Sequence, residues 1–406
     1  MLQTKLREVF MKKILVLNSG SSSLKYQLFE TDGSAFRVII KGLAERIGID
    51  NSNISYQTEN GTKETMNIPL ENHEITLKAI FDILLKTSLS SIDELWAVGH
   101  RLGHGGEYFD KSVVIDDNVI EKIYETKDLL PLHGNAFILG IEAMKNLLPN
   151  IKQIATFDSA FHQTMPKEAY LYALPLEQYE KYRIRRYGFH GTSHYYVSKE
   201  LLKIMPSAKK IISCHLGSGS SITAIKNGKS IDTSFGFAAS CGVTMGTRCG
   251  DIDAFIPLYI MKTQNKTADE VNQMMNKESG LCALSGGYSD TRDIEKRYNE
   301  GDEKAIVAVN IYVHNIVKYI GAYTAEMGGV DAIIFTAGIG ENSSFLRQKI
   351  CDRLKFMGLD INQDANQLRS QFVELSTKDS KIKAFVIPTN EELVIAQDTY
   401  ELCANA

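Results

Sequence analysis

The sequence lacks the features that would assign it to a membrane or to nucleic acid. Among its 406 residues we find no apolar run long enough to cross a bilayer. Charges are nearly balanced, with 45 Lys and Arg against 49 Asp and Glu, and neither sign forms a long block. This pattern argues against nucleic acid or an anionic membrane as a partner. An anionic ligand must therefore be bound by a local site.

Cysteine is also scarce, and its spacing excludes two common roles. The six cysteines form no CxxC pair and no zinc-like spacing with histidine. We therefore expect neither disulfides nor a structural metal, and a reducing, cytoplasmic location. Residues 1–10 are too short and too polar for a signal peptide, so we interpret them as an N-terminal extension.

The length and composition predict two globular domains. A chain of 406 residues exceeds the size at which one hydrophobic core stops growing, and 44% hydrophobic and 23% charged residues are ordinary values. A cleft between two domains is then available for a ligand. We predict hinge closure of that cleft if the chemistry must exclude water.

Two segments half the chain apart resemble each other. Residues 14–26 read ILVLNSGSSSLKY and residues 211–223 read IISCHLGSGSSIT. Each predicts a strand, a Gly/Ser turn and a second strand, which together form a hairpin whose tip exposes backbone N–H groups and hydroxyls. A single loop of this kind is often a plain surface turn. Two in register indicate a duplication.

The C-terminal half continues with alternating helices and strands. Apolar spacing predicts a helix over residues 305–327, a strand over 332–335 and a helix over 345–357. Between the last two lies the Gly-rich turn TAGIGEN at 336–342. A strand, a glycine turn and a helix start can offer free N–H groups to an anion. The turn lacks the spacing of a Walker A loop or a dinucleotide fingerprint.

Histidine, arginine and acidic residues gather in a few Gly-rich strings. Taken singly, a histidine here would satisfy a loop, an arginine would form a surface ion pair, and a carboxylate would cap a helix. Their joint occurrence favours a functional site. The strings are HRLGHGGE (100–107), LHGN (132–135), FDSAFHQ (157–163), YGFHGTSH (187–194), MGTRCGDID (245–253) and PTNEE (388–392).

These residue types suit phosphoryl transfer to a carboxylate. A simple carboxylate is already ionised at neutral pH and needs no general base. The obstacle is repulsion between two anions, which guanidinium groups, a donating histidine and Mg²⁺ can neutralise. Arg101 and Arg248 could bind carboxylate or phosphate in bidentate fashion. Asp158 and Glu391 could hold hydrated Mg²⁺, which takes few protein carboxylates.

The ordered strings resemble those of the acetate kinase family from Lys12 to the C-terminus. The resemblance is carried by LVLNSGSSSLKY, HRLGHGGE, FDSAFHQTMP, YGFHGTSH, CHLGSGSS, MGTRCGDID, SGLCALSGGYSD, FTAGIGENS and PTNEEL. It implies two ribonuclease H-like α/β domains related by duplication, as in actin and hexokinase, with an interdomain cleft. The expected domains are residues 11–160 plus 391–406, and residues 161–390, the second binding nucleotide.

The resemblance also implies a role for each matching residue. ATP or ADP and Mg²⁺, or Mn²⁺, would be bound, and transfer would be direct and in line, giving acetyl phosphate. Catalysis would depend on Asn18, Arg101, Asp158, His190 and Arg248. Phosphate and transition-state contacts would come from Ser21, Ser23, His133 and His190, and metal contacts from Asn18, Asp158 and Glu391. Nucleotide would contact Lys25, His215, Gly217, Ser218, Gly219, Asp290, Thr291, Arg292, Gly338, Ile339, Gly340 and Asn342.

The sequence departs from the family's motifs at three positions. Ser218 stands where the family usually has Asn. In the apolar pocket for the methyl group, Leu132 and Phe189 remain, but Gly103 replaces a valine and Ala239 replaces a proline. Both pocket changes remove volume, so we hypothesise a pocket that accepts propionate or longer acids comparatively well. The opposing interpretation is that neighbouring side chains move in and acetate stays preferred.

Other interpretations remain open at this stage. The chain could be a propionate kinase, a pyrophosphate-dependent member of the family, or a non-enzymatic actin-like ATPase. The strings SDTRD and GIGEN favour a nucleotide over pyrophosphate. Arginine and histidine outside the two hairpins favour an enzyme, because a filament has no use for them. The resemblance further implies a homodimer, with small molecules as its other partners.

Overall fold

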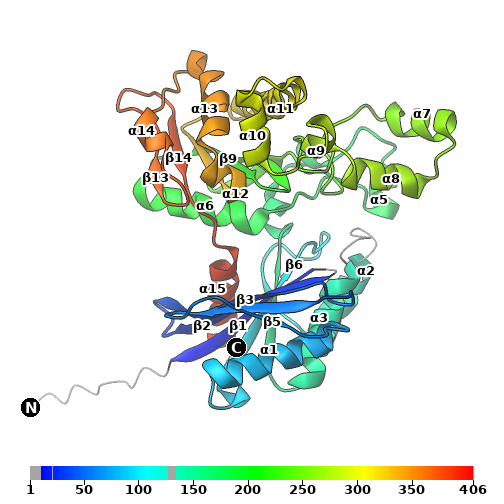
Figure 1. The fold of residues 1–406 in the computed structure, drawn as a ribbon, viewed down its shortest axis with the longest axis vertical. Coiled ribbons are helices and arrows are strands. Elements are labelled where there is room, and N and C mark those ends of the chain that lie inside the picture. Colours follow the sequence, from blue (N-terminus) through cyan, green and yellow to red (C-terminus); the bar gives the residue numbers. More distant parts are fainter. Residues whose placement is uncertain (1–10, 21, 127–133, 406) are drawn as a thin grey trace, which may run out of the picture. The chain divides into compact units, whose positions relative to one another are not determined.

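The structure, a computed structural model, describes residues 11–20, 22–126 and 134–405 (Figure 1). The chain divides into two compact units. Unit 1 comprises Met1–Ala160 with Asn390–Ala406, and unit 2 comprises Phe161–Thr389. Each is an α/β unit with one mixed sheet, which confirms the expected fold class. The proposed N-terminal extension lies outside the described residues.

Unit 1 has a sheet in the order β5-β4-β3-β2-β1-β6-β8-β7. Its strands are β1 (Lys12–Ser19), β2 (Ser23–Thr31), β3 (Phe36–Glu45), β4 (Asn53–Thr58), β5 (Glu64–Asn67), β6 (Leu95–Leu102), β7 (Val113–Val114) and β8 (Lys152–Phe157). Its helices are α1 (His73–Thr87), α2 (Asp117–Thr126), α3 (Gly134–Leu147) and α15 (Glu391–Ala404).

Unit 2 has a sheet in the order β11-β10-β9-β12-β14-β13. Its strands are β9 (Lys210–Leu216), β10 (Ser220–Lys226), β11 (Lys229–Thr233), β12 (Ala332–Thr336), β13 (Val373–Glu374) and β14 (Lys383–Val386). Its helices are α4 (Lys167–Tyr170), α5 (Glu177–Tyr182), α6 (Gly191–Ile204), α7 (Phe255–Gln264), α8 (Ala268–Lys277), α9 (Gly280–Leu284), α10 (Thr291–Asn299), α11 (Glu303–Met327), α12 (Ala337–Asn342), α13 (Ser344–Asp352) and α14 (Gln363–Asn366).

The two sheets share one topology. In unit 1, β1, β2 and β3 pair antiparallel, β1, β6 and β8 pair parallel, and β7 returns antiparallel to β8. In unit 2, β9, β10 and β11 repeat the antiparallel part, β9, β12 and β14 the parallel part, and β13 returns antiparallel to β14. The two predicted hairpins are β1–β2 and β9–β10. Six strands therefore recur in the same order and direction, as the internal repeat indicated.

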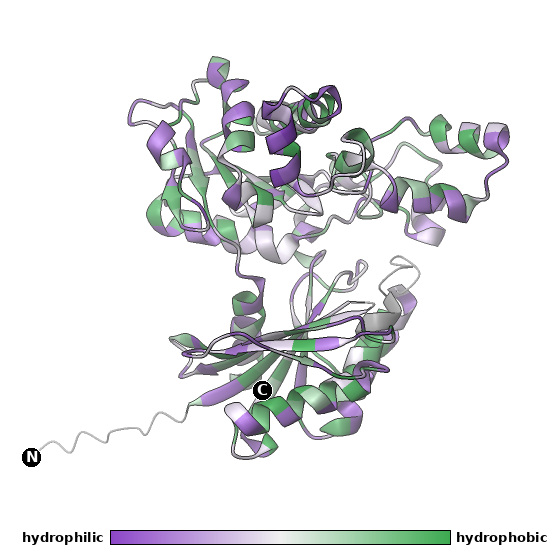
Figure 2. Cartoon of the chain, viewed as in Figure 1, coloured by the Kyte–Doolittle hydropathy of each residue, from purple (hydrophilic) through white to green (hydrophobic). Residues whose placement is uncertain are grey.

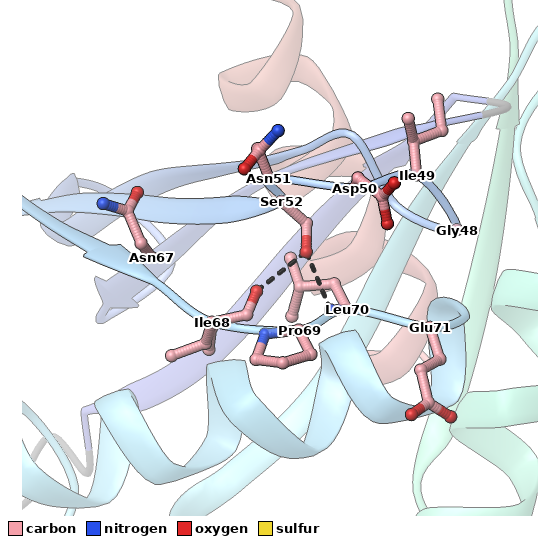
Figure 3. Close-up of a pocket in the computed structure, with 10 residues that line it drawn as sticks. All are labelled: Gly48, Ile49, Asp50, Asn51, Ser52, Asn67, Ile68, Pro69, Leu70 and Glu71. Carbon is pink, nitrogen blue, oxygen red and sulfur yellow. Dashed lines mark hydrogen bonds between the residues drawn. The ribbon is translucent and has the colours of Figure 1, made fainter.

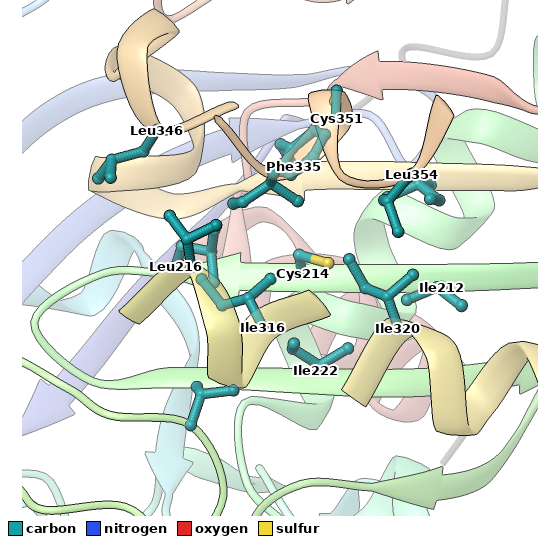
Figure 4. Close-up of a cluster of buried hydrophobic side chains, with 14 of the residues drawn as sticks. Ile212, Cys214, Leu216, Ile222, Ile316, Ile320, Phe335, Leu346, Cys351 and Leu354 are labelled. Atoms are coloured by element: carbon teal, nitrogen blue, oxygen red, sulfur yellow. The ribbon is translucent and has the colours of Figure 1, made fainter. Parts of the chain in front are cut away.

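The core of unit 2 forms on both faces of its sheet. Alternate residues of a strand point to opposite faces. On β9, Ile212 and Cys214 pack against α11 and α13 (Figure 4). Ile211 packs against α6 on the opposite face. Helix α11 is long and apolar enough, by length and composition, to cross a membrane. Nine of its side chains are buried in the core of unit 2, so it is a core helix.

Unit 1 follows the same plan. On β1, Leu15 and Leu17 face α1 and α3, while Ile14 and Val16 face α15. Helix α15 lies so close to β6 that a Cβ atom on Gly99 would come within 2.5 Å of Ile395 Cγ2. Strand β1 accordingly carries four consecutive buried apolar residues, 14–17. Helix α10 of unit 2, in contrast, buries only Ile294 and is mostly hydrophilic (Figure 2).

The predicted elements of the C-terminal half are confirmed with two corrections. Helix α11 and strand β12 match the expected segments. The helix expected over 345–357 ends at Asp352 and is followed by a 3₁₀ turn at Lys355–Met357. The expected Gly-rich turn at 336–342 is largely the short helix α12, which begins directly after β12.

A buried arginine holds α12, α13 and the segment after α14 together. Arg347 is 1% exposed and donates to the carbonyls of Gly340, Glu341, Asn366 and Leu368 and to the side chain of Asn366. Burial lowers the pKa of Arg347 to about 10, so it is still charged at neutral pH. One guanidinium thus satisfies several carbonyls that no helix or strand would satisfy.

We predict that Arg347→Leu lowers the free energy of unfolding by about 3 kcal/mol or more, because several buried carbonyls lose their donor. Chemical denaturation would measure the change. Arg353→Leu is the matched control, since Arg353 is exposed and follows directly after α13. Equal effects of the two substitutions would contradict this role of Arg347.

Candidate functional site

In unit 1 a polar cluster lies where parallel strands end. Asn18 on β1 pairs in register with Arg101 on the parallel strand β6, and Asp158 directly follows β8. The backbone N–H of Asp158 donates to the carbonyl of Leu102, and this bond extends the β6–β8 ladder by one residue. Glu391 is the first residue of α15. Residues far apart in the sequence therefore meet at one edge of the sheet.

Arg101 is the centre of this cluster. Its Nε donates to Asp158 Oδ1 over 3.1 Å, its Nη2 to Asp158 Oδ2 over 2.5 Å, and its Nη1 to Asn18 Oδ1 over 3.3 Å. Glu391 Oε2 lies 3.5 Å from Nε. Burial opposes the charge, but the two carboxylates outweigh it and raise the pKa of Arg101 above its ordinary value. The guanidinium therefore has carboxylate partners within the protein.

A second ion pair adjoins the first. Lys25 on β2 pairs with Glu392, whose side chain is buried. With Arg101, Asp158 and Glu391, the five groups carry two positive and three negative charges. The surplus of negative charge and the all-oxygen donor set suit a hard divalent cation.

No group of three or more His, Cys, Asp or Glu side chains is placed to hold a metal ion among the residues that the structure describes. Asp158 and Glu391 with the Asn18 amide still fit Mg²⁺, because this ion keeps most of its water and takes one or two carboxylates. The residues present are thus compatible with a hydrated ion.

In unit 2 the corresponding strand end carries histidines. His215 lies at the end of β9, in the place that Asn18 has on β1. The ring of His190 stacks on the ring of His215, with centroids 3.9 Å apart and planes at 25°. His190 precedes α6 with φ of +58°, a left-handed backbone conformation that is uncommon for residues other than glycine. Its ring is thereby held by stacking and by its position at the start of the helix.

Arg248 lies beside His190 and differs from Arg101 in its charge balance. A Cβ atom on Gly219 would lie 3.5 Å from Arg248 Nη1 and 3.5 Å from His190 Cε1. Nη1 donates to the carbonyl of Ala239 over 2.7 Å. Within the described parts of the chain no carboxylate pairs with Arg248, and burial lowers its pKa. A half-buried guanidinium without a counter-charge indicates a binding site for an anion.

A pocket of about 580 Å³ in unit 2 contains most of the predicted nucleotide residues. It is formed by the β9–β10 turn, α10, α12 and Arg369. Its volume lies within the range of small-molecule sites, about 300–1,000 Å³. Predicted residues in its lining are Gly217, Ser218, Asp290, Thr291, Arg292, Gly338, Ile339 and Asn342.

The pocket also has lining residues that we did not predict. Glu295, Lys296 and Asn299 follow Arg292 at helical spacing on α10, so their position could have been inferred once a helix was assumed there. Ser343 and Arg369 complete the set. Arg369 comes from a loop distant in the sequence, and no local sequence pattern predicts its place in the pocket.

Two predicted nucleotide residues have local structural partners. Asp290 caps α10 by accepting from the backbone N–H of Arg292, and its ion pair with the Arg292 guanidinium lowers its pKa to about 2. In the turn after β12, Glu341 Oε1 accepts from the N–H of Ala337 over 2.9 Å. The first N–H of α12 is therefore occupied, contrary to our expectation of a free group there.

A further pocket of about 510 Å³ lies in unit 1, between the β3–β4 turn and the segment before α1 (Figure 3). Among its described lining residues, Asp50 and Glu71 are the only ionisable ones. The Ser52 hydroxyl donates to the carbonyl of Ile68 and accepts from the N–H of Leu70 (Figure 3). The pocket holds no constellation with chemical function.

The remaining predicted residues divide between the units. Ser23 starts β2, and Gly103 follows β6 in unit 1. Phe189, 5% exposed, packs its ring edge-on to Phe235, and Ala239 contacts Arg248, both in unit 2. Gly340 is buried within α12. Ser21, Leu132 and His133 lie outside the described residues.

Comparison with known proteins agrees with these motifs. The model of the acetokinase family matches residues 13–397. The chain belongs to the acetokinase family. It is 50% identical to an acetate kinase of Halothermothrix orenii over 393 residues, which cover 95% of this chain and 98% of that protein.

Solved structures of the acetokinase family share the whole fold. A Porphyromonas gingivalis acetate kinase is 42% identical, with a TM-score of 0.91, covering 96% of this chain and 99% of that one. A Francisella tularensis propionate kinase is 39% identical, also with a TM-score of 0.91, covering 97% and 100%. The resemblance recognised in the sequence is therefore confirmed.

We predict that Arg248→Leu leaves the thermal unfolding midpoint unchanged or raises it, because it removes a half-buried charge that no carboxylate of the described residues pairs with. The same substitution should abolish stabilisation of the protein by inorganic phosphate. Differential scanning calorimetry with and without phosphate measures both effects. Arg353→Leu should retain the phosphate effect. A strongly destabilised Arg248→Leu that still responds to phosphate would refute an anion site.

Proposed function

We propose that this chain is a Mg²⁺-dependent acetate kinase that transfers a phosphoryl group reversibly, directly and in line between ATP and acetate, giving ADP and acetyl phosphate. The observation that carries the proposal is Arg248, a guanidinium beside the His190 ring that has no carboxylate partner among the described residues. Donors fixed before the anion arrives need no reorganisation when charge develops on the transferring group.

The nucleotide is assigned to the pocket on unit 2. The β9–β10 turn with Gly217, Ser218 and Gly219 would contact phosphates, and α10 and α12 would contact the nucleoside. Ser218 is shorter than the usual Asn, and its carbonyl accepts from the N–H of Gly246 over 3.1 Å. That bond links the phosphate turn to the loop that carries Arg248. His215 would assist near the phosphates.

The metal is assigned to Asn18, Asp158 and Glu391. A bound Mg²⁺, or Mn²⁺, would neutralise charge on the phosphates. In this interpretation Arg101 keeps the Asp158 carboxylate oriented through two hydrogen bonds, and also offers its guanidinium to the carboxylate substrate. Ser21, Ser23, Lys25 and His133 would complete the phosphate contacts.

The preferred acid is acetate, with propionate accepted comparatively well. Phe189 and Leu132 would line the alkyl pocket, and Gly103 and Ala239 would leave it wider than valine and proline do. The similarity to a protein described as a propionate kinase supports the wider range. One extra methylene in such a pocket changes binding by about 1–3 kcal/mol, enough to reorder two acids.

Two rival functions make different demands on the sequence. A pyrophosphate-dependent enzyme has no need for the lining that α10 and Arg369 provide. An actin-like ATPase that only assembles needs no uncompensated Arg248. Both rivals are therefore less well supported than the kinase.

The location and assembly follow the same family inference. We propose a cytoplasmic protein, which agrees with six unpaired thiols among the described residues. We also propose a homodimer. Large apolar side chains are exposed on unit 2, including Phe255 at 76%, Tyr259 at 67% and Leu176 at 61%, and such surface is typical of an interface.

The proposed reaction is tested by trapping acyl phosphate with hydroxylamine. We expect product from ATP, Mg²⁺ and acetate, no product when chelator removes the metal, and none when pyrophosphate replaces ATP. Product with pyrophosphate but not ATP would favour the first rival. ATP hydrolysis without product from any short acid would favour the second.

We predict that Gly103→Val lowers kcat/KM for propionate and butyrate by about tenfold relative to acetate, because it restores volume beside the alkyl group. Steady-state kinetics on the three acids measures the ratio. Ser34→Val, on an exposed loop, is the control. An unchanged ratio would mean that position 103 does not limit the acid.

A further inference from the structure

Below α6 the sheet of unit 2 carries a row of buried hydroxyls. Ser213 on β9 and Ser221 on β10 have the same strand parity as Ile211 and Ile225, which pack against α6. Both serines therefore point to the α6 face, and both are 0% exposed. They lie under the first turn of that helix, where His194 is also 0% exposed.

These groups form a continuous hydrogen-bond chain. His194 Nδ1 lies 2.8 Å from Ser213 Oγ, and His194 Nε2 lies 2.8 Å from Ser221 Oγ. Ser221 Oγ is in turn 3.0 Å from His190 Nδ1. One buried hydroxyl thus joins a histidine inside the unit to the histidine beside Arg248.

The chemistry of the three groups limits the chain to two directions. A hydroxyl has one proton to donate, and a neutral imidazole has one N–H and one acceptor nitrogen. Burial lowers the pKa of His194 well below its ordinary value, so it is neutral. Either His194 donates to Ser221 and Ser221 donates to His190 Nδ1, or His190 Nδ1 carries the proton and donates to Ser221, which then donates to His194 or accepts from it as well.

The two arrangements differ in whether His190 Nε2 carries a proton. This nitrogen is on the side of Gly219, where a Cβ atom would lie 3.6 Å from it and 3.5 Å from Arg248 Nη1. In the first direction Nε2 carries a proton and can donate to an anion held by Arg248. In the reverse direction a neutral His190 presents a lone pair there, which an anion repels.

We propose that Ser221 is a positioning residue, which accepts from His194 Nε2 and donates to His190 Nδ1 and so holds His190 as the Nε2–H tautomer that faces the transferring phosphoryl group. The inference rests on the proposed function, because the anion selects the direction. A neutral His190 then suffices as the donor, because the Ser221 hydroxyl at Nδ1 fixes its tautomer.

The tautomer of His190 can be measured without turnover. In ¹⁵N-histidine-labelled wild type saturated with inorganic phosphate, the two ring nitrogens of His190, assigned by loss of their signals in His190→Gln, should show a protonated Nε2 and an acceptor Nδ1. In Ser221→Ala we expect a mixture of tautomers. A wild-type His190 protonated at Nδ1 with an acceptor Nε2 would overturn the proposal. This measurement is made on wild type, so it does not depend on whether a variant folds.

Kinetics separate positioning from folding. Ser221→Ala should lower kcat by about 10- to 100-fold, with KM for ATP and acid changed less than threefold, because donation to the transition state weakens more than ground-state binding. Ser230→Ala is the matched control: Ser230 is also 0% exposed and bonds a histidine Nδ1, that of His162, over 2.8 Å. It should stay within about threefold of wild type.

Other outcomes have distinct meanings. Equal losses of kcat in Ser221→Ala and Ser230→Ala would overturn the proposal, since removal of any buried Ser–His bond would then suffice. Wild type without acyl phosphate synthesis would refute the proposed function, while the tautomer of His190 would still report on the hydrogen-bond chain.

Discussion

The strict alternation of side chains along paired strands is the constraint on which both polar clusters depend. On β1 and β9 one face of the sheet is apolar near the strand start, where α15 or α6 packs. The same face becomes polar at the strand end, with Asn18 in one unit and His215 in the other. A helix begins beside each polar end, at Glu391 and at Gly191. A shift of one residue in either register would turn these side chains to the opposite face.

The duplicated frame carries two different charge balances. In unit 1, Arg101 is enclosed by Asn18, Asp158 and Glu391, and the cluster with Lys25 and Glu392 has surplus negative charge. In unit 2, Arg248 has only carbonyl and thioether partners among the described residues. One cluster suits a cation and the other suits an anion. Phosphoryl transfer between two anions needs both kinds of group.

Much of the fold could be predicted because the responsible signals are local. The β1–β2 and β9–β10 hairpins follow from apolar strands around a Gly/Ser turn, and α11 follows from its apolar spacing. The end of α13 could not be predicted, because Leu354 and Met357 continue the apolar period while the chain tightens into a 3₁₀ turn. The occupied N–H of Ala337 depends on the Glu341 side chain, whose conformation the glycine spacing does not determine.

The site residues show the same division. Motif strings identified Arg101, Asp158, His190 and Arg248, but not that one arginine is compensated and the other is not. That difference depends on which strand ends lie side by side. Ser221 was missed because a serine in a strand has no distinguishing pattern. Its role becomes visible only when the register of β9 and β10 places it opposite His215 and beneath His194.

Transfer of isotope from the acid to the product tests the central claim most directly. With acetate labelled with ¹⁸O in both carboxylate oxygens, unlabelled ATP and Mg²⁺, the account predicts acetyl phosphate with one ¹⁸O bonded to phosphorus. The ³¹P NMR signal would then show the isotope shift of a single ¹⁸O. Acetyl phosphate whose phosphorus carries no ¹⁸O would contradict attack of the carboxylate on the γ-phosphoryl group, and with it the roles assigned to both clusters.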